Sequence, residues 1–486
     1  MACTTLLVGK KASYDGSTMI ARTDDGNFDV KKLIVVNPED QPKNYKSVIG
    51  RGKVKLPKNP MRYTACPNVE KHEGIWAASG INEANVGMTA TETINNNPLV
   101  LGCDPMVRYK QKTETEPEAA GGLGEEDFVV LVLPYIHTAR EGVERLGALL
   151  EQYGTYECNG IAFNDADEIW IMETVGGHHW LARRVPDEVY VMMPNRHGID
   201  RFDFEDAYGE QKEYMCDKDL KDFVRRCHLD LEQDGEFNPR YAFGTRSDAD
   251  HIYNNPRAWY MGRYFNPSSY LWDGEKADFT PECDDIPWAL VPDHKITVED
   301  VKHILSSCYQ GTPYDPYQKA DVKEKGIYRP IGISRTGVTT ICQINGEKED
   351  RLKAIEWVSF GSNPFNAAIP VYPHVSQMPK YLSEVSADVS TENFYWCSRL
   401  IGALADAEYG NCVQMIERYQ NSVAAKSHAL LHEYNAKFME TKDEAVFAEA
   451  NDAIAEMIRT ETARILKQVL GTVSHHMKNG FSRADH

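Results

Sequence analysis

The first twenty-five residues constrain the fold of this chain more than any other segment. An apolar run over residues 3–8 is followed by turn-forming residues over 10–16 and by a second apolar run over 18–22. This pattern predicts two strands that form a hairpin, so that the chain returns to its own start. Arg22, Asp24 and Asp25 are therefore expected near Cys3, about twenty residues earlier in the sequence.

Cys3 lies where a thiol and a terminal amine can belong to one residue. After removal of Met1 and Ala2, an α-amino group that titrates near about 8 would lie beside a thiol that titrates near about 8.5. The amine could then take the thiol proton directly or through one water, without a separate histidine. By itself, a cysteine at this position is more often a small buried apolar residue, and Arg22 is as often a solvated ion pair of little energetic value.

Several segments resemble a known family in the same order along the chain. The opening segments, CTTLLVG from residue 3, DGST from residue 15 and ARTDD from residue 21, resemble the dipeptidase A family of cysteine N-terminal-nucleophile (Ntn) hydrolases. That family is related to bile salt hydrolases and penicillin V acylases. Further matching segments are SGINEANVGM at 79–88, residues 164–173, MPNR at 193–196 and WVSFG at 357–361. The resemblance extends to about residue 372 and is weakest in the C-terminal hundred residues.

The resemblance implies an α+β fold, a four-layer αββα sandwich with a helical C-terminal extension. Short apolar or alternating runs, which predict strands, agree with it; they cover 33–36, 74–81, 86–93, 160–164, 169–174, 179–185 and 190–193. Helical periodicity covers 128–133, 139–152, 392–407, 412–437 and 444–473. We expect residues 1–375 to form the catalytic domain with insertions and residues 376–486 to form a helical C-terminal region.

The resemblance also implies the site residues. Cys3 would be the nucleophile, and Arg22 and Asp25 would set its charge state, since a nearby cation favours a thiolate and a carboxylate can orient an ammonium. Asn82, with a backbone N–H, would hold the oxyanion, and Asn195 would hold the α-amino group or orient the site. The site arginine would be Arg257, with Arg263 as the competing choice. Without the family, Asn82 and Asn195 at predicted strand ends would be ordinary turn residues.

Two other segments are predicted from composition. The acidic, Gly-rich residues 112–127 predict a surface loop, and a mobile cover over the site is the alternative. Residues 238–292, rich in Tyr, Trp, Pro and Asp, predict a largely irregular segment packed by its aromatic side chains.

Composition excludes some partners. A chain of 486 residues with 42% hydrophobic residues can bury a large core, and its net charge of −20 argues against nucleic-acid and anionic membrane surfaces. The eleven cysteines contain no Cys-x-x-Cys, which favours a reducing compartment over a disulfide framework or zinc ribbon.

Adjacent histidines, as at His178 and His179, diverge on a strand and do not predict a metal pair. We expect a cytoplasmic homo-oligomer that uses no metal or cofactor.

Together these features predict a cysteine dipeptidase that hydrolyses short, unblocked peptides, chiefly dipeptides. Two alternatives remain open: an acylase of the same fold that acts on a bile salt or penicillin, and a catalytically silent scaffold like the secernin relatives. Loss of Met1 would leave Ala2 still covering the Cys3 amine. Maturation must therefore include a second step, either autoproteolysis or trimming by another aminopeptidase.

Overall fold

Two large antiparallel sheets form the centre of the computed structural model, which describes residues 3–70, 72, 74–89, 92–233 and 235–477. Sheet 1 has the strand order β15-β13-β1-β2-β16-β17-β18. β1 and β2 form the predicted N-terminal hairpin, with Thr5 opposite Arg22. The strands of sheet 1 are β1 (Thr4–Val8), β2 (Thr18–Asp24), β13 (Tyr190–Met193), β15 (Ala289–Leu290), β16 (Val338–Ile344), β17 (Ala354–Phe360) and β18 (Ile369–Val371).

Sheet 2 has the order β14-β12-β11-β10-β8-β7, and β9 also pairs with β10. Its strands are β7 (Ser79–Ile81), β8 (Gly87–Thr89), β9 (Glu92–Thr93), β10 (Asn159–Asn164), β11 (Ile169–Val175), β12 (His179–Val185) and β14 (Tyr214–Cys216). The strand predicted over 74–81 is confirmed only at its end, because Trp76 and Ala78 have left-handed φ angles of 51° and 55°. Two small sheets pair β3 (Ile34–Val36) with β6 (Tyr63–Ala65) and β4 (Asn44–Lys46) with β5 (Lys53–Lys55).

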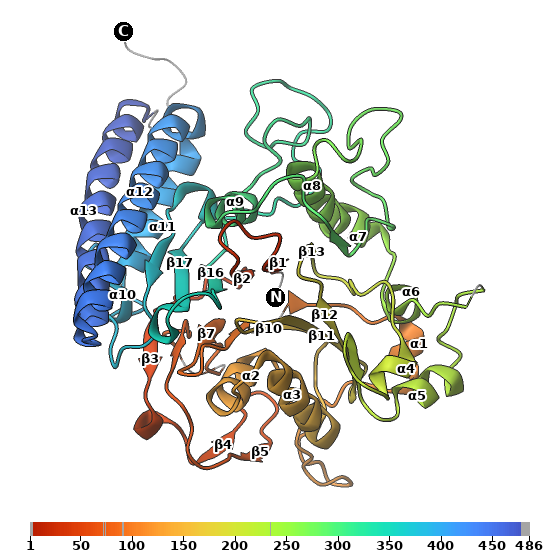
Figure 1. The fold of residues 1–486 in the computed structure, drawn as a ribbon. Helices are drawn as coiled ribbons and strands as arrows, with labels where there is room; N and C mark the ends of the chain where they lie inside the picture. The colour runs from red at the N-terminus through yellow and green to blue at the C-terminus, as the bar shows by residue number, and fades with distance from the viewer. Residues whose placement is uncertain (1–2, 71, 73, 90–91, 234, 478–486) are drawn as a thin grey trace.

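The sheets pack face to face because side chains alternate along each strand. Leu7 and Ile20 of the hairpin lie in a core between the sheets together with Ile171 of β11. Their neighbours Leu6 and Ala21 lie on the other face of sheet 1, in a second core shared with helices. A third core lies between the outer face of sheet 2 and helices α2 and α3. The predicted αββα order of layers is confirmed (Figure 1).

The helices cover the two outer faces and the rim. Helix α3 packs across β10, β11 and β12, while α8 and α9 pack on β13, β1 and β2. In chain order, the helices before the C-terminal layer are α1 (Pro98–Cys103), α2 (Glu125–Val132), α3 (Ala139–Tyr153), α4 (Phe204–Ala207), α5 (Leu220–Arg226), α6 (Pro239–Phe243), α7 (Asp248–Tyr253), α8 (Asn255–Phe265), α9 (Val298–Leu305) and α10 (Lys380–Ser383).

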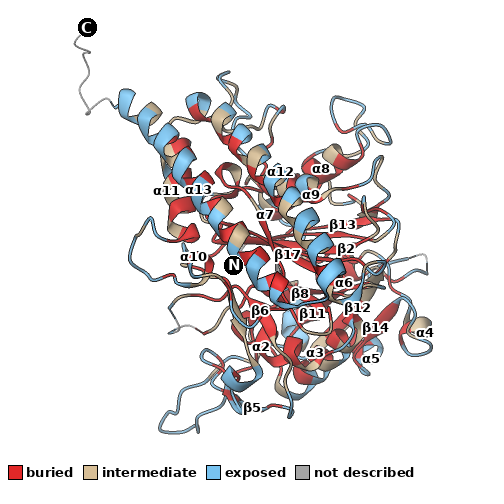
Figure 2. Ribbon diagram, turned by 60° about the vertical axis from the view of Figure 1, so that its left-hand side comes forward, coloured by how far each residue is buried: buried red, intermediate tan, exposed pale blue. Residues whose placement is uncertain are grey.

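The three predicted C-terminal helices are confirmed, with bounds that differ by a few residues. They are α11 (Phe394–Ala407), α12 (Tyr409–Thr441) and α13 (Ala445–His475). Ile454, Ile458 and Ile465 lie along the buried stripe of α13, at the spacing expected for one helix face. The opposite faces of α12 and α13 are exposed (Figure 2). These helices share one core with sheet 1, and a domain boundary at residue 375 stays a prediction.

Two predictions from composition are wrong in part. Residues 112–120 are exposed, as a surface loop should be, but residues 121–127 are buried and α2 begins at Glu125. Residues 238–292 contain three helices, of which α8 is eleven residues long. Pro256 in its first turn is a helix-start signal, which the abundance of Tyr, Trp and Pro obscured.

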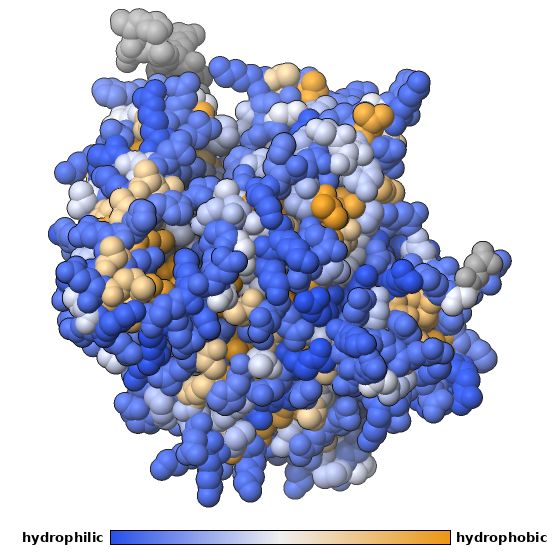
Figure 3. All heavy atoms as spheres, viewed as in Figure 1, coloured by the Kyte–Doolittle hydropathy of each residue, from blue (hydrophilic) through white to orange (hydrophobic). Residues whose placement is uncertain are grey.

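The surface agrees with the charged composition. Hydrophilic residues cover most of the face seen in Figure 3, with apolar residues in small groups. Within the described part of the chain, every helix is too short or too polar to cross a membrane.

Candidate active site

Cys3 immediately precedes β1, in the middle of sheet 1, and its side chain is buried. The antiparallel register of β1 and β2 brings Arg22 back to it. Arg22 Nη2 donates a hydrogen bond to Cys3 Sγ at 2.8 Å, and Nη1 donates to the carbonyl oxygen of Ala78 at 3.2 Å. A guanidinium in contact with sulfur stabilises a thiolate. The hairpin therefore places an activating cation on the predicted nucleophile.

Asp25 is linked through the side chains of Thr23 and Arg329 to Thr4, the residue after Cys3. Its carboxylate forms an ion pair with Arg329 and accepts hydrogen bonds from Thr336 Oγ1 at 2.6 Å and Thr23 Oγ1 at 3.1 Å. Thr23 Oγ1 in turn accepts the backbone N–H of Thr4 at 3.0 Å. Asp25 thus fixes the residue that follows the nucleophile.

Arg329 is a site residue that the sequence reasoning missed. Besides its ion pair with Asp25, its Nη1 donates to Thr4 Oγ1 at 3.4 Å. Burial alone would lower the pKa of Arg329, but the Asp25 carboxylate outweighs that effect and raises the pKa above its usual value. The segment around it, KGIYRPIG, contains no periodic or motif signal that would have singled it out.

Arg257, on α8, joins Cys3 to Asn195. Its Nη1 donates to the carbonyl oxygen of Cys3 at 2.5 Å and to Thr4 Oγ1 at 2.7 Å. Its Nη2 donates to Asn195 Oδ1 at 2.7 Å, and Asn195 Nδ2 donates to the carbonyl oxygen of Thr93 at 2.8 Å. Arg263 instead pairs with Asp273 at 2.8 Å, 30% exposed. Of the two candidate arginines, the structure brings Arg257 to Cys3.

Asn82 is not brought to the thiol. Its Nδ2 donates to the carbonyl oxygens of Leu133 and Ile136, both at 2.8 Å, and its Oδ1 accepts the N–H groups of Ala84 and Val86. Both amide hydrogens are therefore used to tie the turn after β7 to the end of α2. The predicted contact of Asn82 with an oxyanion is not tested by these hydrogen bonds and stays a prediction.

Glu125, the first residue of α2, is the second residue that the sequence reasoning missed. It forms an ion pair with Arg22, and both side chains are 1% exposed. Glu126 and Asp127 follow it and are also buried. Burial raises the pKa of Glu126 to about 8 and that of Asp127 to about 6. Three acidic residues before the apolar run FVVLV are a helix-start signal, which the acidic composition of the preceding segment masked.

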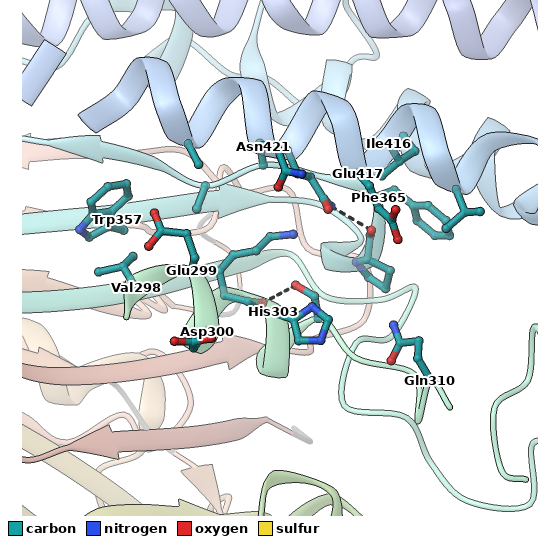
Figure 4. Close-up of a pocket in the computed structure, with 18 of the residues that line it drawn as sticks. Val298, Glu299, Asp300, His303, Gln310, Trp357, Phe365, Ile416, Glu417 and Asn421 are labelled. Atoms are coloured by element: carbon teal, nitrogen blue, oxygen red, sulfur yellow. Dashed lines mark hydrogen bonds between the residues drawn. The ribbon is translucent and has the colours of Figure 1, made fainter. Parts of the chain in front are cut away.

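A separate pocket of about 280 Å³ lies between α9 and α12, over Trp357 on the outer face of sheet 1 (Figure 4). Lys302 lines it and donates to the carbonyl oxygen of Asn363 at 3.3 Å. Burial lowers the pKa of Lys302 to about 7. The six residues predicted for catalysis do not line this pocket.

The structure is therefore an αββα sandwich of the Ntn-hydrolase type, with a buried thiol in contact with an arginine at the start of a central strand. Comparison with known proteins makes this more specific. The model of peptidase family C69 matches residues 2–422. This chain belongs to that family and is a peptidase.

Named relatives match along the whole length. The chain is 49% identical to the "Dipeptidase" of Bifidobacterium longum (strain NCC 2705) and to the "Probable dipeptidase A" of Streptococcus pyogenes serotype M3, covering 100% of both chains in each case. It is 41% identical to "Dipeptidase A" of Lactobacillus helveticus over 96% of each chain. A crystal structure of the C2A mutant conjugated bile acid hydrolase from Clostridium perfringens is similar at 12% identity and a TM-score of 0.32, over 76% of this chain and 92% of that one. The fold assignment rests on the layers described above and not on that structure.

Proposed function

We propose that this protein is a dipeptidase that uses Cys3 as its N-terminal nucleophile and hydrolyses short peptides with a free amino end. The observation that carries the proposal is the 2.8 Å contact between Arg22 Nη2 and Cys3 Sγ at the start of β1. The names of the relatives support the substrate class, since each is called a dipeptidase or a probable one.

The proposed reaction begins after cleavage of the Ala2–Cys3 bond. The freed α-amine takes the thiol proton, and the thiolate, stabilised by Arg22, attacks the scissile carbonyl carbon. The C–N bond of the tetrahedral intermediate then breaks, and the α-ammonium of Cys3 gives its proton to the leaving amine. Water, deprotonated by the same amine, attacks the thioester and releases the acyl part as a carboxylic acid.

Asn195, rather than Asn82, is the side-chain amide that we assign to the oxyanion, together with backbone N–H groups. Thr5 lies opposite Met193 in the β1–β13 pairing, so the same register continued by two residues sets Asn195 opposite Cys3. Arg257 holds both Cys3 and Asn195. A neutral donor fixed by its neighbours loses little reorganisation energy when negative charge develops on the substrate oxygen.

A substrate panel tests the proposal. The mature protein is offered unblocked dipeptides, the same dipeptides N-acetylated, a longer peptide, a glycine-conjugated bile salt and penicillin V. We expect fast hydrolysis of the unblocked dipeptides and a marked loss on acetylation. Preferential cleavage of the bile salt or penicillin would identify an acylase instead, and no turnover of any compound would favour a scaffold.

A further inference from the structure

One oxygen of Glu125 lacks a hydrogen-bond partner within the described structure. Oε1 pairs with Arg22, whereas Oε2 is fully buried and contacts no donor. Buried polar atoms are almost always hydrogen-bonded, because leaving one without a partner is costly. Glu125 is linked to Cys3 through a single side chain, that of Arg22. A buried oxygen without a hydrogen-bond donor at this place points to a group that the site holds only when substrate is bound.

The charges around Glu125 indicate which kind of group is missing. Glu157 Oε1 accepts the backbone N–H of Glu125 at 2.8 Å, and Glu126 and Asp127 continue the same helical turn. Among the described residues, these four carboxyl groups share one ion pair, that of Glu125 with Arg22. Burial, with the charge of Glu125, raises the pKa of Glu157 to about 7. The cluster has more acidic groups than cations, so a bound cation would reduce the repulsion between its carboxylates.

Bond geometry agrees with a substrate ammonium. In a dipeptide, the free amine lies two bonds, or about 2.5 Å, from the scissile carbonyl carbon. That carbon must approach the sulfur to about 3–3.5 Å for attack, and a carboxylate oxygen accepts an ammonium hydrogen bond at about 2.8 Å. The carboxylate should therefore lie roughly 4–6 Å from Sγ. Arg22 Nη2 contacts both Sγ and Glu125 Oε1, which sets that carboxylate oxygen within about 5 Å of the sulfur.

We propose that Glu125, assisted by Glu157, binds the α-ammonium group of the substrate residue whose carbonyl is attacked. This inference rests on the proposed dipeptidase function and names the group that recognises its substrate. Glu157 also lines a surface cleft of about 400 Å³ with Arg108, Tyr109 and Tyr156. A blocked amine or a bile salt presents no cation to this carboxylate and leaves Oε2 unpaired.

Two other roles for Glu125 predict different behaviour. If it only orients Arg22, its loss must slow all substrates by the same factor. If it holds the α-amine of Cys3 itself, the same equal loss is expected, because that amine takes part whatever the substrate. Binding of the substrate ammonium affects only substrates that carry one.

The test compares Ala-Ala with its desamino analogue, N-propionyl-alanine, in the mature wild type and in Glu125→Gln. The readout is the ratio of kcat/KM for the two compounds. We expect the ratio to fall at least about tenfold in Glu125→Gln, through loss of Ala-Ala turnover. Glu126→Gln is the matched control, since Glu126 is in the same turn and already protonated near neutral pH; its ratio should equal that of the wild type.

An unchanged ratio in folded Glu125→Gln overturns the inference while leaving the proposed function intact. If wild type hydrolyses neither compound, the proposed function fails first, and the inference fails with it. Circular dichroism reports whether Glu125→Gln folds. If it does not, Glu157→Gln decides by the same ratio: a fall supports the ammonium site, and no change overturns it.

Discussion

Two buried carboxyl groups at opposite sides of the molecule behave in opposite ways. Glu461 on α13 is 3% exposed and Glu126 on α2 is 1% exposed. Burial alone would raise the pKa of Glu461, but hydrogen bonds from Lys426 at 2.5 Å and Arg464 at 2.6 Å outweigh it and lower the pKa. Glu126 receives hydrogen bonds from Tyr156 and Ser47, both neutral, and its pKa rises. Burial is therefore common to Glu461 and Glu126, and what distinguishes Glu126 is that no cation among the described residues pairs with it.

The largest expected effect is on the nucleophile. Cys3→Ala should lower kcat/KM for a dipeptide by at least about 10³-fold, because no other group can form the thioester. The melting temperature should stay within a few degrees of wild type. Cys412→Ala, at a buried position of α12 in the other region, is the control and should keep full activity. Comparable losses in both variants would mean that Cys3 acts only through packing.

The arginine that contacts the thiol comes next. Arg22→Gln removes the donor to Sγ and leaves Glu125 without its ion pair, so kcat/KM should fall about 10²–10³-fold. Arg464→Gln removes one of the two cations that pair with Glu461 and leaves Lys426 in place. It should lower the thermal stability measured by calorimetry and leave kcat/KM within about twofold. Equal kinetic losses at the two sites would contradict the contrast between the regions.

The two asparagines should separate catalysis from structure. Asn195→Ala should lower kcat by about 10²-fold or more if it contacts the oxyanion. Asn82→Ala should instead lower the free energy of unfolding by about 1–3 kcal/mol, because its side chain satisfies four backbone groups. Single-turnover rates and urea unfolding of both variants check this. The reverse pattern would restore the role first predicted for Asn82.

The smallest expected effect concerns stability against pH. The pKa of Glu126 is about 8 in the folded state, which is above its value in the unfolded chain. The folded state therefore binds one more proton between these two pKa values. Wild type loses stability as the pH rises from about 4.5 to 8. The free energy of unfolding of Glu126→Gln should therefore exceed that of wild type by about 1–3 kcal/mol across that window.

Glu461 has a lowered pKa, so Glu461→Gln should be less stable than wild type at neutral pH, with a difference that vanishes as pH falls below about 4. Urea unfolding at pH 4, 6 and 8 measures both slopes.

Local periodicity was enough to predict the hairpin and the long C-terminal helices, because each depends on residues close in sequence. The layer order was predicted from the family resemblance. The contact between Arg22 and Cys3 followed from the hairpin for the same reason. Glu125 and Arg329 reach the site from 103 and 304 residues beyond their partners Arg22 and Asp25. Contacts of that separation leave no local pattern. Asn82 follows β7, at the predicted strand end. A strand end fixes the position of a residue but not the direction in which its amide points, so its role stays a prediction.

The most direct test of the account is the N-terminus of the active enzyme. Intact mass and N-terminal sequencing are measured on the same preparation whose dipeptide hydrolysis is assayed, before and after maturation. We expect active chains to begin at Cys3 and activity to rise in proportion to the fraction of such chains. Full activity in a preparation whose every chain still begins at Met1 or Ala2 would contradict this expectation.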